Sequence, residues 1–342
     1  MTKFITRVSV YVGLALLLAG LVIYLFIRLY PAYFLGSPMD YYICTFQYDR
    51  IDSSNYRNII IGDSRGNASV NPRGLGGSWI NLSIPGSDCF EGFYTLKRYL
   101  RRNKLDTLIM IYGLDYLEGE SPFFKLRTVP FRFVTANELH ELAVVERSVG
   151  IAFHDSTVKG KGALLMHELA RQLKYDHFPL SYRETFIDGL TSLLQLSAYT
   201  EEKSREHESL LKRDLGHLNF GLADSDNTVF LGYRDRRFRA DPINLAFLDS
   251  ITVLAARNNI VTYFILAPMN RATWLTYKNS VLQSTVSAFL RELAAKYPRM
   301  HVVGEPVFLD NTYFGDPLHL NPRGTALYTT NLRRLLSTGL PQ

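Results

Sequence analysis

Two short segments, far apart in the chain, carry residue types suited to nucleophilic catalysis. Ser64 lies two residues beyond an apolar run at 58–62, inside the turn Gly-Asp-Ser-Arg-Gly. Asp316 precedes His319 by three residues, near the end of the 342-residue chain. At this spacing a carboxylate can reach the imidazole, fix its tautomer and stabilise the imidazolium formed when histidine takes a serine proton. Because serine is a poor nucleophile without such a base, the three residues predict a Ser-His-Asp triad.

A purely structural interpretation of both segments is also open. Gly, Asp and Ser are all turn-forming residues, so a Gly-Asp-Ser turn after a strand is common. Asn321 before Pro322 suits the start of a helix, which would make Asp316 an ordinary loop residue. This interpretation accounts for Asn321 but gives no reason for His319.

Alternating strands and helices are predicted to position these residues. Fully apolar runs such as TLIMIYG and TYFILAP suit strands that are buried on both faces. Strand–helix alternation favours parallel pairing with right-handed crossovers, and therefore a doubly wound, three-layer α/β sandwich with a central parallel sheet. Strands are expected at 58–62, 79–84, 107–113, 261–267 and 301–303, and helices at 89–102, 242–257, 276–296 and 322–336.

The carboxyl ends of these strands are the expected place for a ligand. Ser64 follows the first strand, Gly86 the second and Asp115 the third. Glycines close to Ser64 allow backbone N–H groups to approach a developing oxyanion, and one such donor is often worth about 3 kcal/mol.

Residues 118–241 interrupt the alternation and are too long for a plain connection. Helices are predicted at 136–149, 161–174 and 184–197, followed by a polar segment at 201–214. We interpret this part as a largely helical insertion above the sheet edge, within a catalytic domain at 56–342. Three arginines are candidates for binding an anionic substrate, with a solvated basic face as the alternative for the last two: Arg65, Arg234 and Arg237.

The N-terminus predicts a membrane anchor at 8–28. Its segment VSVYVGLALLLAGLVIYLFI is apolar and long enough to span a bilayer. Lys3 and Arg7 precede it, which favours a cytoplasmic tail at 1–7 and an extracytoplasmic domain. A cleaved signal peptide is the alternative, but no clear small-x-small cleavage site follows. Residues 29–55 are interpreted as a Tyr-rich connector.

Composition narrows the class of protein further. The net charge of +6 comes without a long Lys/Arg block, so no nucleic-acid module is indicated, although a basic surface would favour anionic lipid or polymer. Cys44 and Cys89 are the two cysteines, and they form either one disulfide or two buried thiols. Neither they nor the histidines, read as ordinary surface or partly buried residues, have metal-site spacing, so no metal is expected. No organic cofactor is expected either, because a triad supplies both nucleophile and proton transfer.

The order of the motifs resembles the SGNH (GDSL-type) hydrolase family. Gly62-x-Ser64-x-Gly66 also matches the α/β-hydrolase elbow, but there the serine follows a mid-sheet strand and the acid is well separated from the histidine. The resemblance covers about residues 56–340, apart from the insertion, and rests on four blocks: GDSR at 62–65, Gly86, GLD at 113–115 and DPLH at 316–319.

This resemblance implies a role for each matching residue. Ser64, His319 and Asp316 would form the triad, and the backbone N–H groups of Ser64 and Gly86 would line the oxyanion hole. The third block of the family normally supplies an Asn amide, whereas this chain has Asp115, and a carboxylate cannot donate in that way. A substitute donor is then expected from Asn81 or Asn270, or the third donor is missing.

Together with the anchor, the motifs resemble the membrane-tethered, extracytoplasmic branch that acylates cell-surface polymers, including a protein of teichoic-acid D-alanylation. That branch implies a serine esterase or O-acyltransferase acting on acyl esters of a cell-envelope glycan or polymer. A polytopic membrane O-acyltransferase is the implied partner. Two alternatives stay open: a catalytically weak binding or scaffold subunit, which Asp115 favours, and a membrane-tethered lipase or thioesterase with an apolar face on the insertion.

Overall fold

The computed structural model describes residues 2–29, 38–119, 121, 123–128, 133–149, 198–233 and 236–338. Its centre is a five-stranded sheet of order β2-β1-β3-β4-β6, in which every pair is parallel. The strands are β1 (Asn58–Gly62), β2 (Trp79–Asn81), β3 (Thr107–Tyr112), β4 (Val261–Leu266) and β6 (Met300–Val303). This arrangement confirms the predicted doubly wound α/β fold. A small second sheet, which pairs β5 (Met269–Asn270) with β7 (Phe308–Leu309), was not predicted.

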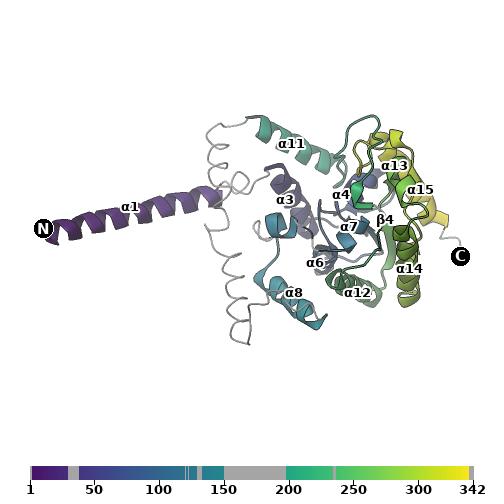
Figure 1. Cartoon of the computed structure of the whole chain (residues 1–342), viewed down its shortest axis with the longest axis horizontal. Helices are drawn as coiled ribbons and strands as arrows, with labels where there is room; N and C mark the ends of the chain where they lie inside the picture. Colours follow the sequence, from purple (N-terminus) through teal and green to yellow (C-terminus); the bar gives the residue numbers. More distant parts are fainter. Residues whose placement is uncertain are drawn as a thin grey trace.

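Helices cover both faces of the sheet, as Figure 1 shows. Successive side chains of a strand point to opposite faces, so Ile59 and Ile61 of β1 pack on one side and Ile60 on the other. The first side is covered by α6 (Cys89–Tyr99), α12 (Pro242–Arg257) and α14 (Val281–Lys296). The second side is covered by α5 (Pro72–Leu75) and α15 (Pro322–Thr338). Burial on both faces explains why the strands are continuously apolar.

Local capping residues set the helix boundaries. Asp241 accepts hydrogen bonds from two backbone N–H groups of α12, and Pro242 occupies the first helical position, so the predicted helix at 242–257 is confirmed. The helix predicted at 276–296 is confirmed at its C-terminal end but begins later, at Val281. The chain there forms α13 (Arg271–Tyr277) and α14, because Asn279 has φ +63° and Ser280 caps the second helix.

The segment interpreted as a connector contains a helix, α3 (Pro38–Ser53). Ile43 of α3 packs with Leu211 of α11 (Ala198–Arg213), and Ile51 joins the core beside the sheet. Because α3 is buried against two neighbours, its apolar residues do not form a single stripe along the helix. The sequence therefore shows no helical periodicity in this segment. Cys44 and Cys89 are both buried and are not joined by a disulfide, so of the two alternatives the structure shows the buried thiols.

The insertion is helical where it is described. The prediction at 136–149 is confirmed by α8 (Ala136–Ser148), and the polar segment at 201–214 lies almost wholly in α11. The predicted helices at 161–174 and 184–197 lie outside the described residues. After α11 the chain reaches the edge strand β2, where Leu215 accepts a hydrogen bond from the backbone of Asn81 at 2.9 Å. The end of the insertion therefore covers this edge of the sheet.

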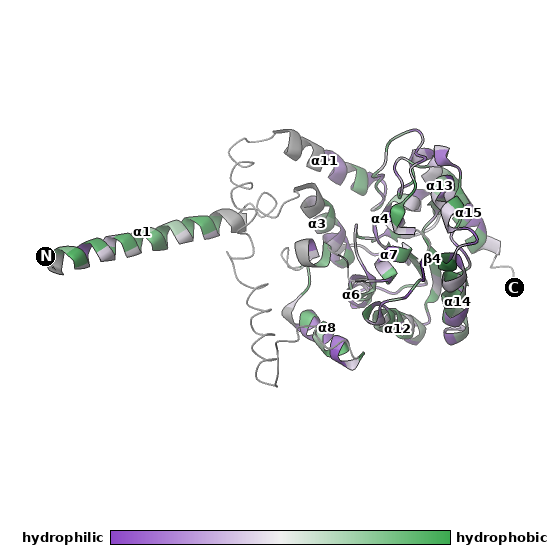
Figure 2. Cartoon of the chain, viewed as in Figure 1, coloured by the Kyte–Doolittle hydropathy of each residue, from purple (hydrophilic) through white to green (hydrophobic). Residues whose placement is uncertain are grey.

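The N-terminal helix α1 (Thr2–Leu29) differs in character from the rest of the chain. Its 22-residue stretch Phe4–Leu25 is long and apolar enough to cross a bilayer, and none of it is buried against the α/β body. Figure 2 shows this helix as a nearly continuous apolar rod. These features fit a signal anchor or a signal sequence.

Candidate active site

Ser64 is the first residue of a short helix, α4 (Ser64–Ser69), that begins directly after β1. Asp63 is the N-cap, and its carboxylate accepts hydrogen bonds from the backbone of Arg65 at 2.7 Å and Gly66 at 3.4 Å. Gly62 makes the sharp exit from the strand possible. Its φ is +155°, and a Cβ there would lie 1.9 Å from the carbonyl oxygen of Ile111.

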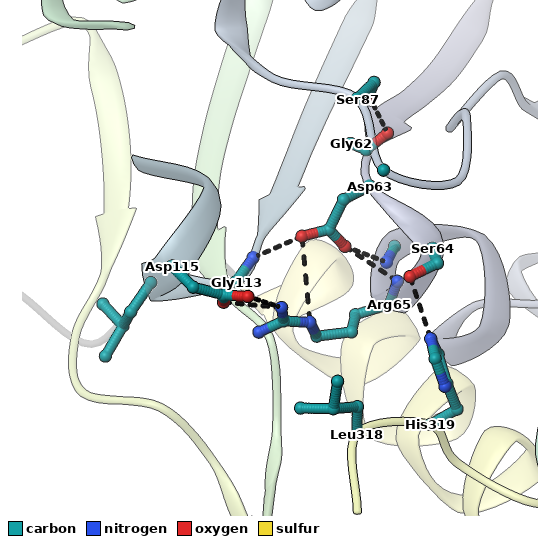
Figure 3. A network of polar contacts seen from close by, with 12 residues as sticks. Gly62, Asp63, Ser64, Arg65, Ser87, Gly113, Asp115, Leu318 and His319 are labelled. Atoms are coloured by element: carbon teal, nitrogen blue, oxygen red, sulfur yellow. Dashed lines mark hydrogen bonds and ion pairs between the residues drawn. The ribbon is translucent and has the colours of Figure 1, made fainter. Parts of the chain in front are cut away.

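The structure brings Ser64, His319 and Asp316 into one hydrogen-bonded chain. Ser64 Oγ lies 2.8 Å from His319 Nε2. Figure 3 marks this hydrogen bond with a dashed line. His319 Nδ1 lies 2.8 Å from Oδ2 and 3.0 Å from Oδ1 of Asp316. An ionised carboxylate only accepts, so Nδ1 carries a hydrogen and the Nε2 lone pair faces the serine hydroxyl. This is the tautomer that a general base for Ser64 requires.

Asp316 is itself oriented by the backbone of its own turn. Its Oδ1 accepts hydrogen bonds from the backbone N–H groups of Leu318 and His319, each at 2.8 Å. Burial raises the pKa of Asp316, but the hydrogen bond and charge of His319 and the two backbone donors outweigh it. The net effect lowers the pKa of this carboxyl below its usual value. Asp316 is therefore an ionised acceptor at neutral pH.

Hydrogen bonds and a ring contact hold the loop that carries His319 in place. Gly315 donates to the carbonyl of His319 at 3.0 Å, and the ring of Phe220 lies 5.2 Å from the imidazole. Asn321 donates to the carbonyl of Thr312 at 3.0 Å and accepts from the backbone of Gly324, at the start of α15. Asn321 thus acts as the predicted helix cap, and it also holds the histidine loop.

Arg65 points away from Ser64 into a buried polar network (Figure 3). Its Nη2 donates to both oxygens of Asp115, at 2.5 and 2.7 Å, and its Nη1 donates to the hydroxyl of Tyr233 at 2.7 Å. Asp63 accepts from the backbone of Gly113 at 2.8 Å and lies 3.8 Å from Arg65 Nε. Burial lowers the pKa of Arg65, but the surrounding oxygens raise it well above the usual value. The guanidinium is a permanent cation that ties the ends of β1 and β3 together.

This network changes the interpretation of two residues. Arg65 is only 2% exposed, so it is not available to a substrate as the sequence suggested. Asp115, which the sequence suggested in place of an Asn donor, is the carboxylate partner of Arg65. Sequence reasoning missed Asp63 and Tyr233; Asp63 had a local signal, since Asp directly before a helical turn suits an N-cap.

The two amides considered as substitute oxyanion donors are used elsewhere. Asn81 donates to three backbone carbonyls at 3.0–3.3 Å, those of Gly66, Asn67 and Val70. Asn270 donates to the carbonyl of Thr228 at 2.9 Å and caps α13. Both side chains hold the backbone around the site rather than facing a bound acyl group.

The turn containing Gly86 lies beside the serine. Ser87 donates its N–H to the carbonyl of Ile84 at 3.0 Å, with Pro85 and Gly86 between them and φ +69° at Gly86. These are the features of a type II turn. Ile84 N–H and Ser87 Oγ both donate to the carbonyl of Gly62, at 2.9 and 2.7 Å. Within the described part of the chain, no acceptor is bonded to the backbone N–H of Ser64 or Gly86.

The remaining predictions concern two arginines and the histidines. Arg237 is exposed, and Arg234 lies outside the described residues. His217 is buried rather than on the surface, with Nδ1 2.8 Å from the carbonyl of Asn67, and burial lowers its pKa. Among the described residues, no group of His, Cys, Asp and Glu is arranged to hold a metal ion.

The fold and the site define an α/β protein with a five-stranded parallel sheet, flanking helices and an apolar N-terminal helix. Comparison of the sequence with models of known families and with curated proteins finds no match.

We expect Asp115→Asn to leave the reactivity of Ser64 within about threefold of the wild-type value. The new amide would remain beside Arg65 instead of becoming an oxyanion donor, while the buried guanidinium would lose an ionic partner at a cost of about 1–3 kcal/mol. Fluorophosphonate labelling rates and urea unfolding would measure the two effects. Faster labelling of the variant would show that an amide at this position does reach the reacting group.

Proposed function

We propose that this protein is a membrane-anchored serine esterase or O-acyltransferase of the SGNH (GDSL) type. The observation that supports this best is the chain of short hydrogen bonds from Ser64 Oγ through His319 to Asp316. Its position at the carboxyl ends of parallel strands is where open α/β sheets bind ligands. The sequence blocks at 62–65 and 316–319 supply the likeness to that family.

The proposed chemistry proceeds through an acyl-serine. Ser64 Oγ attacks the carbonyl carbon of an ester as His319 Nε2 takes the hydroxyl proton, and the tetrahedral oxyanion forms near the N–H groups of Ser64 and Gly86. Collapse breaks the ester bond, and the departing alkoxide takes the proton from His319. Water or a sugar hydroxyl then attacks the acyl-serine with His319 again as base, and collapse breaks the bond to Ser64 Oγ, which takes the proton back from His319. The product is a free acid in hydrolysis and a new ester in transfer.

The substrate we propose is an acyl ester of a cell-envelope glycan or polymer. The apolar helix α1, with Lys3 and Arg7 before its core, supports an anchor that leaves the α/β body on the extracytoplasmic side. In this setting a polytopic membrane O-acyltransferase would supply the acyl group. The net charge of +6 suits an anionic polymer.

A non-catalytic binding or scaffold subunit is the second candidate. It is favoured by the third oxyanion position, where Asp115 is paired with Arg65 and the amides of Asn81 and Asn270 are bonded to backbone carbonyls. Two backbone donors would then have to stabilise the oxyanion without a side-chain amide. The two candidates differ in whether Ser64 is activated.

Fluorophosphonate labelling of the full-length chain in detergent tests that difference. We expect covalent labelling of the tryptic peptide 58–65, in which Ser64 is the only serine. Ser64→Ala removes the nucleophile and His319→Ala removes the base, so folded samples of both variants should remain unlabelled. An unlabelled, folded wild-type protein would contradict the enzyme and support the binding subunit.

A further inference from the structure

Two side chains from the first part of the insertion donate hydrogen bonds to the turn beside Ser64. Arg127 Nη1 donates to the carbonyl of Pro85, and Ser121 Oγ donates to the carbonyl of Gly86. Both donors are buried, with 2% and 1% of their surfaces exposed. Arg127 belongs to a π-helical turn, η1 (Phe124–Thr128). Two consecutive carbonyls of the turn are thus held from the side of the insertion.

Arg127 is fixed in place by a buried acid. Its Nη2 lies 3.2 Å from Glu91 Oε1, and Thr128 donates to the same carboxylate. Glu91 also completes the capping box at the start of α6 by accepting from the backbone of Asp88. The guanidinium is therefore bound to a helix terminus on one side and to the carbonyl of Pro85 on the other.

The direction of the Gly86 N–H depends on the hydrogen bond from Arg127 to the carbonyl of Pro85. In a trans peptide the C=O and N–H bonds point in opposite directions, so the carbonyl of Pro85 determines where the N–H of Gly86 points. Type I and type II turns differ chiefly by a flip of this central peptide. Glycine tolerates φ of either sign, so Gly86 alone does not prevent the flip. A donor that holds the carbonyl of Pro85 does prevent it.

We infer that Arg127 is a clamp: a positioning residue that locks the Pro85–Gly86 peptide in the orientation required of an oxyanion donor, while Ser121 holds the next peptide, Gly86–Ser87. This inference rests on the proposed serine chemistry. The ring of Phe123 closes the other side, because a Cβ on Gly86 would lie 2.3 Å from its Cδ2 atom. The insertion thereby fixes one of the two backbone donors of the oxyanion hole, in a site that has no Asn side-chain donor.

The double variant Arg127→Met/Glu91→Gln tests the clamp without leaving a buried carboxylate unpaired. Its matched control is Arg98→Met/Glu138→Gln, which removes a partly buried Arg–Glu pair that also begins on α6. We expect the fluorophosphonate labelling rate to fall about 10- to 100-fold in the clamp variant and to stay near the wild-type rate in the control. Ser121→Ala should give a smaller decrease of the same kind.

An NMR measurement reports on the peptide itself. Pro85–Gly86 is the only Pro-Gly dipeptide in the sequence, so proline labelled with ¹³C at the carbonyl and glycine labelled with ¹⁵N select one amide signal. We expect this signal to shift when the wild type is phosphonylated, and to be doubled or displaced in the free clamp variant. In the control variant it should match the wild type.

The possible results distinguish failure of the clamp inference from failure of the proposed function. Equal labelling rates for wild type, clamp variant and control, with an unchanged Pro85–Gly86 signal, would overturn the clamp and leave the serine enzyme standing. Absence of labelling in the wild type would overturn the proposed function, and the inference with it. A lower labelling rate that is the same in clamp variant and control would show a merely structural role for Arg127.

Discussion

Asp316→Asn is expected to slow acylation of Ser64 by about 10³- to 10⁴-fold while the protein stays folded. The hydrogen bonds of Asp316 explain why an isosteric change has this effect. Oδ1 accepts from two backbone N–H groups, and Oδ2 accepts from His319 Nδ1. The asparagine oxygen must take the first position to satisfy the backbone donors, which places its NH₂ group against the imidazole. His319 then accepts at Nδ1 and carries its hydrogen on Nε2, so it cannot take a proton from Ser64.

Labelling rates with a fluorophosphonate would measure this effect, with Asp310→Asn as the matched control. Asp310 lies in the same region and caps the short helix η4 (Asn311–Tyr313), with its carboxylate 3.1 Å from the backbone N–H of Thr312, but it does not contact His319. The control should label at the wild-type rate. Similar rates for wild type and Asp316→Asn would mean that His319 is not held by this carboxylate during the reaction.

The lowered pKa of Asp316 also predicts how the stability of the fold depends on pH. A carboxyl whose pKa is lower in the folded than in the unfolded state stabilises the fold at pH values above the unfolded pKa of about 3.9. That contribution is lost as the pH falls through the folded pKa. The stability difference between wild type and Asp316→Asn should therefore shrink as the pH falls below about 4.

What the sequence could predict was governed by local patterns. The apolar runs of β1, β3 and β4 and the Asp241–Pro242 start of α12 are signals contained within a few residues, and the structure confirms these elements. The Asp316–His319 contact is also local, since the two residues are three apart. Ser64 could be placed near them only through the rule that parallel strands present their carboxyl ends at one edge.

The remaining features depend on contacts between distant residues. Arg65 meets Tyr233 across 168 positions, and Arg127 meets Pro85 across 42, so no spacing pattern could reveal either contact. For this reason the sequence suggests a substrate ligand at Arg65 and a missing oxyanion donor at Asp115, whereas in the structure the two side chains bind each other. The helix α3 was missed for a related reason, since its burial comes from two separate neighbours.

Arg65→Met is expected to lower the free energy of unfolding by about 3–5 kcal/mol. The substitution keeps most of the side-chain volume but leaves the buried carboxylate of Asp63 without a neighbouring cation, and it removes both hydrogen bonds to Asp115. Tyr233 also loses its partner in the network. Urea unfolding in detergent, followed by the fluorescence of Trp79 and Trp274, would measure the change, since both tryptophans lie in the α/β body.

Two further variants distinguish a structural role for Arg65 from a role in substrate binding. Arg57 pairs with Asp106 on the exposed surface, so Arg57→Met should leave the free energy of unfolding close to the wild-type value. Arg65→Met/Asp115→Asn removes one of the unpaired carboxylates and should recover part of the lost stability. Arg65→Met could instead have the wild-type free energy of unfolding but a lower affinity for an anionic substrate. In that case the guanidinium would have to leave Asp115 and reach the reacting group. The buried network would then be a resting arrangement that the substrate opens, and Ser64 and Arg65 would act on the same ligand.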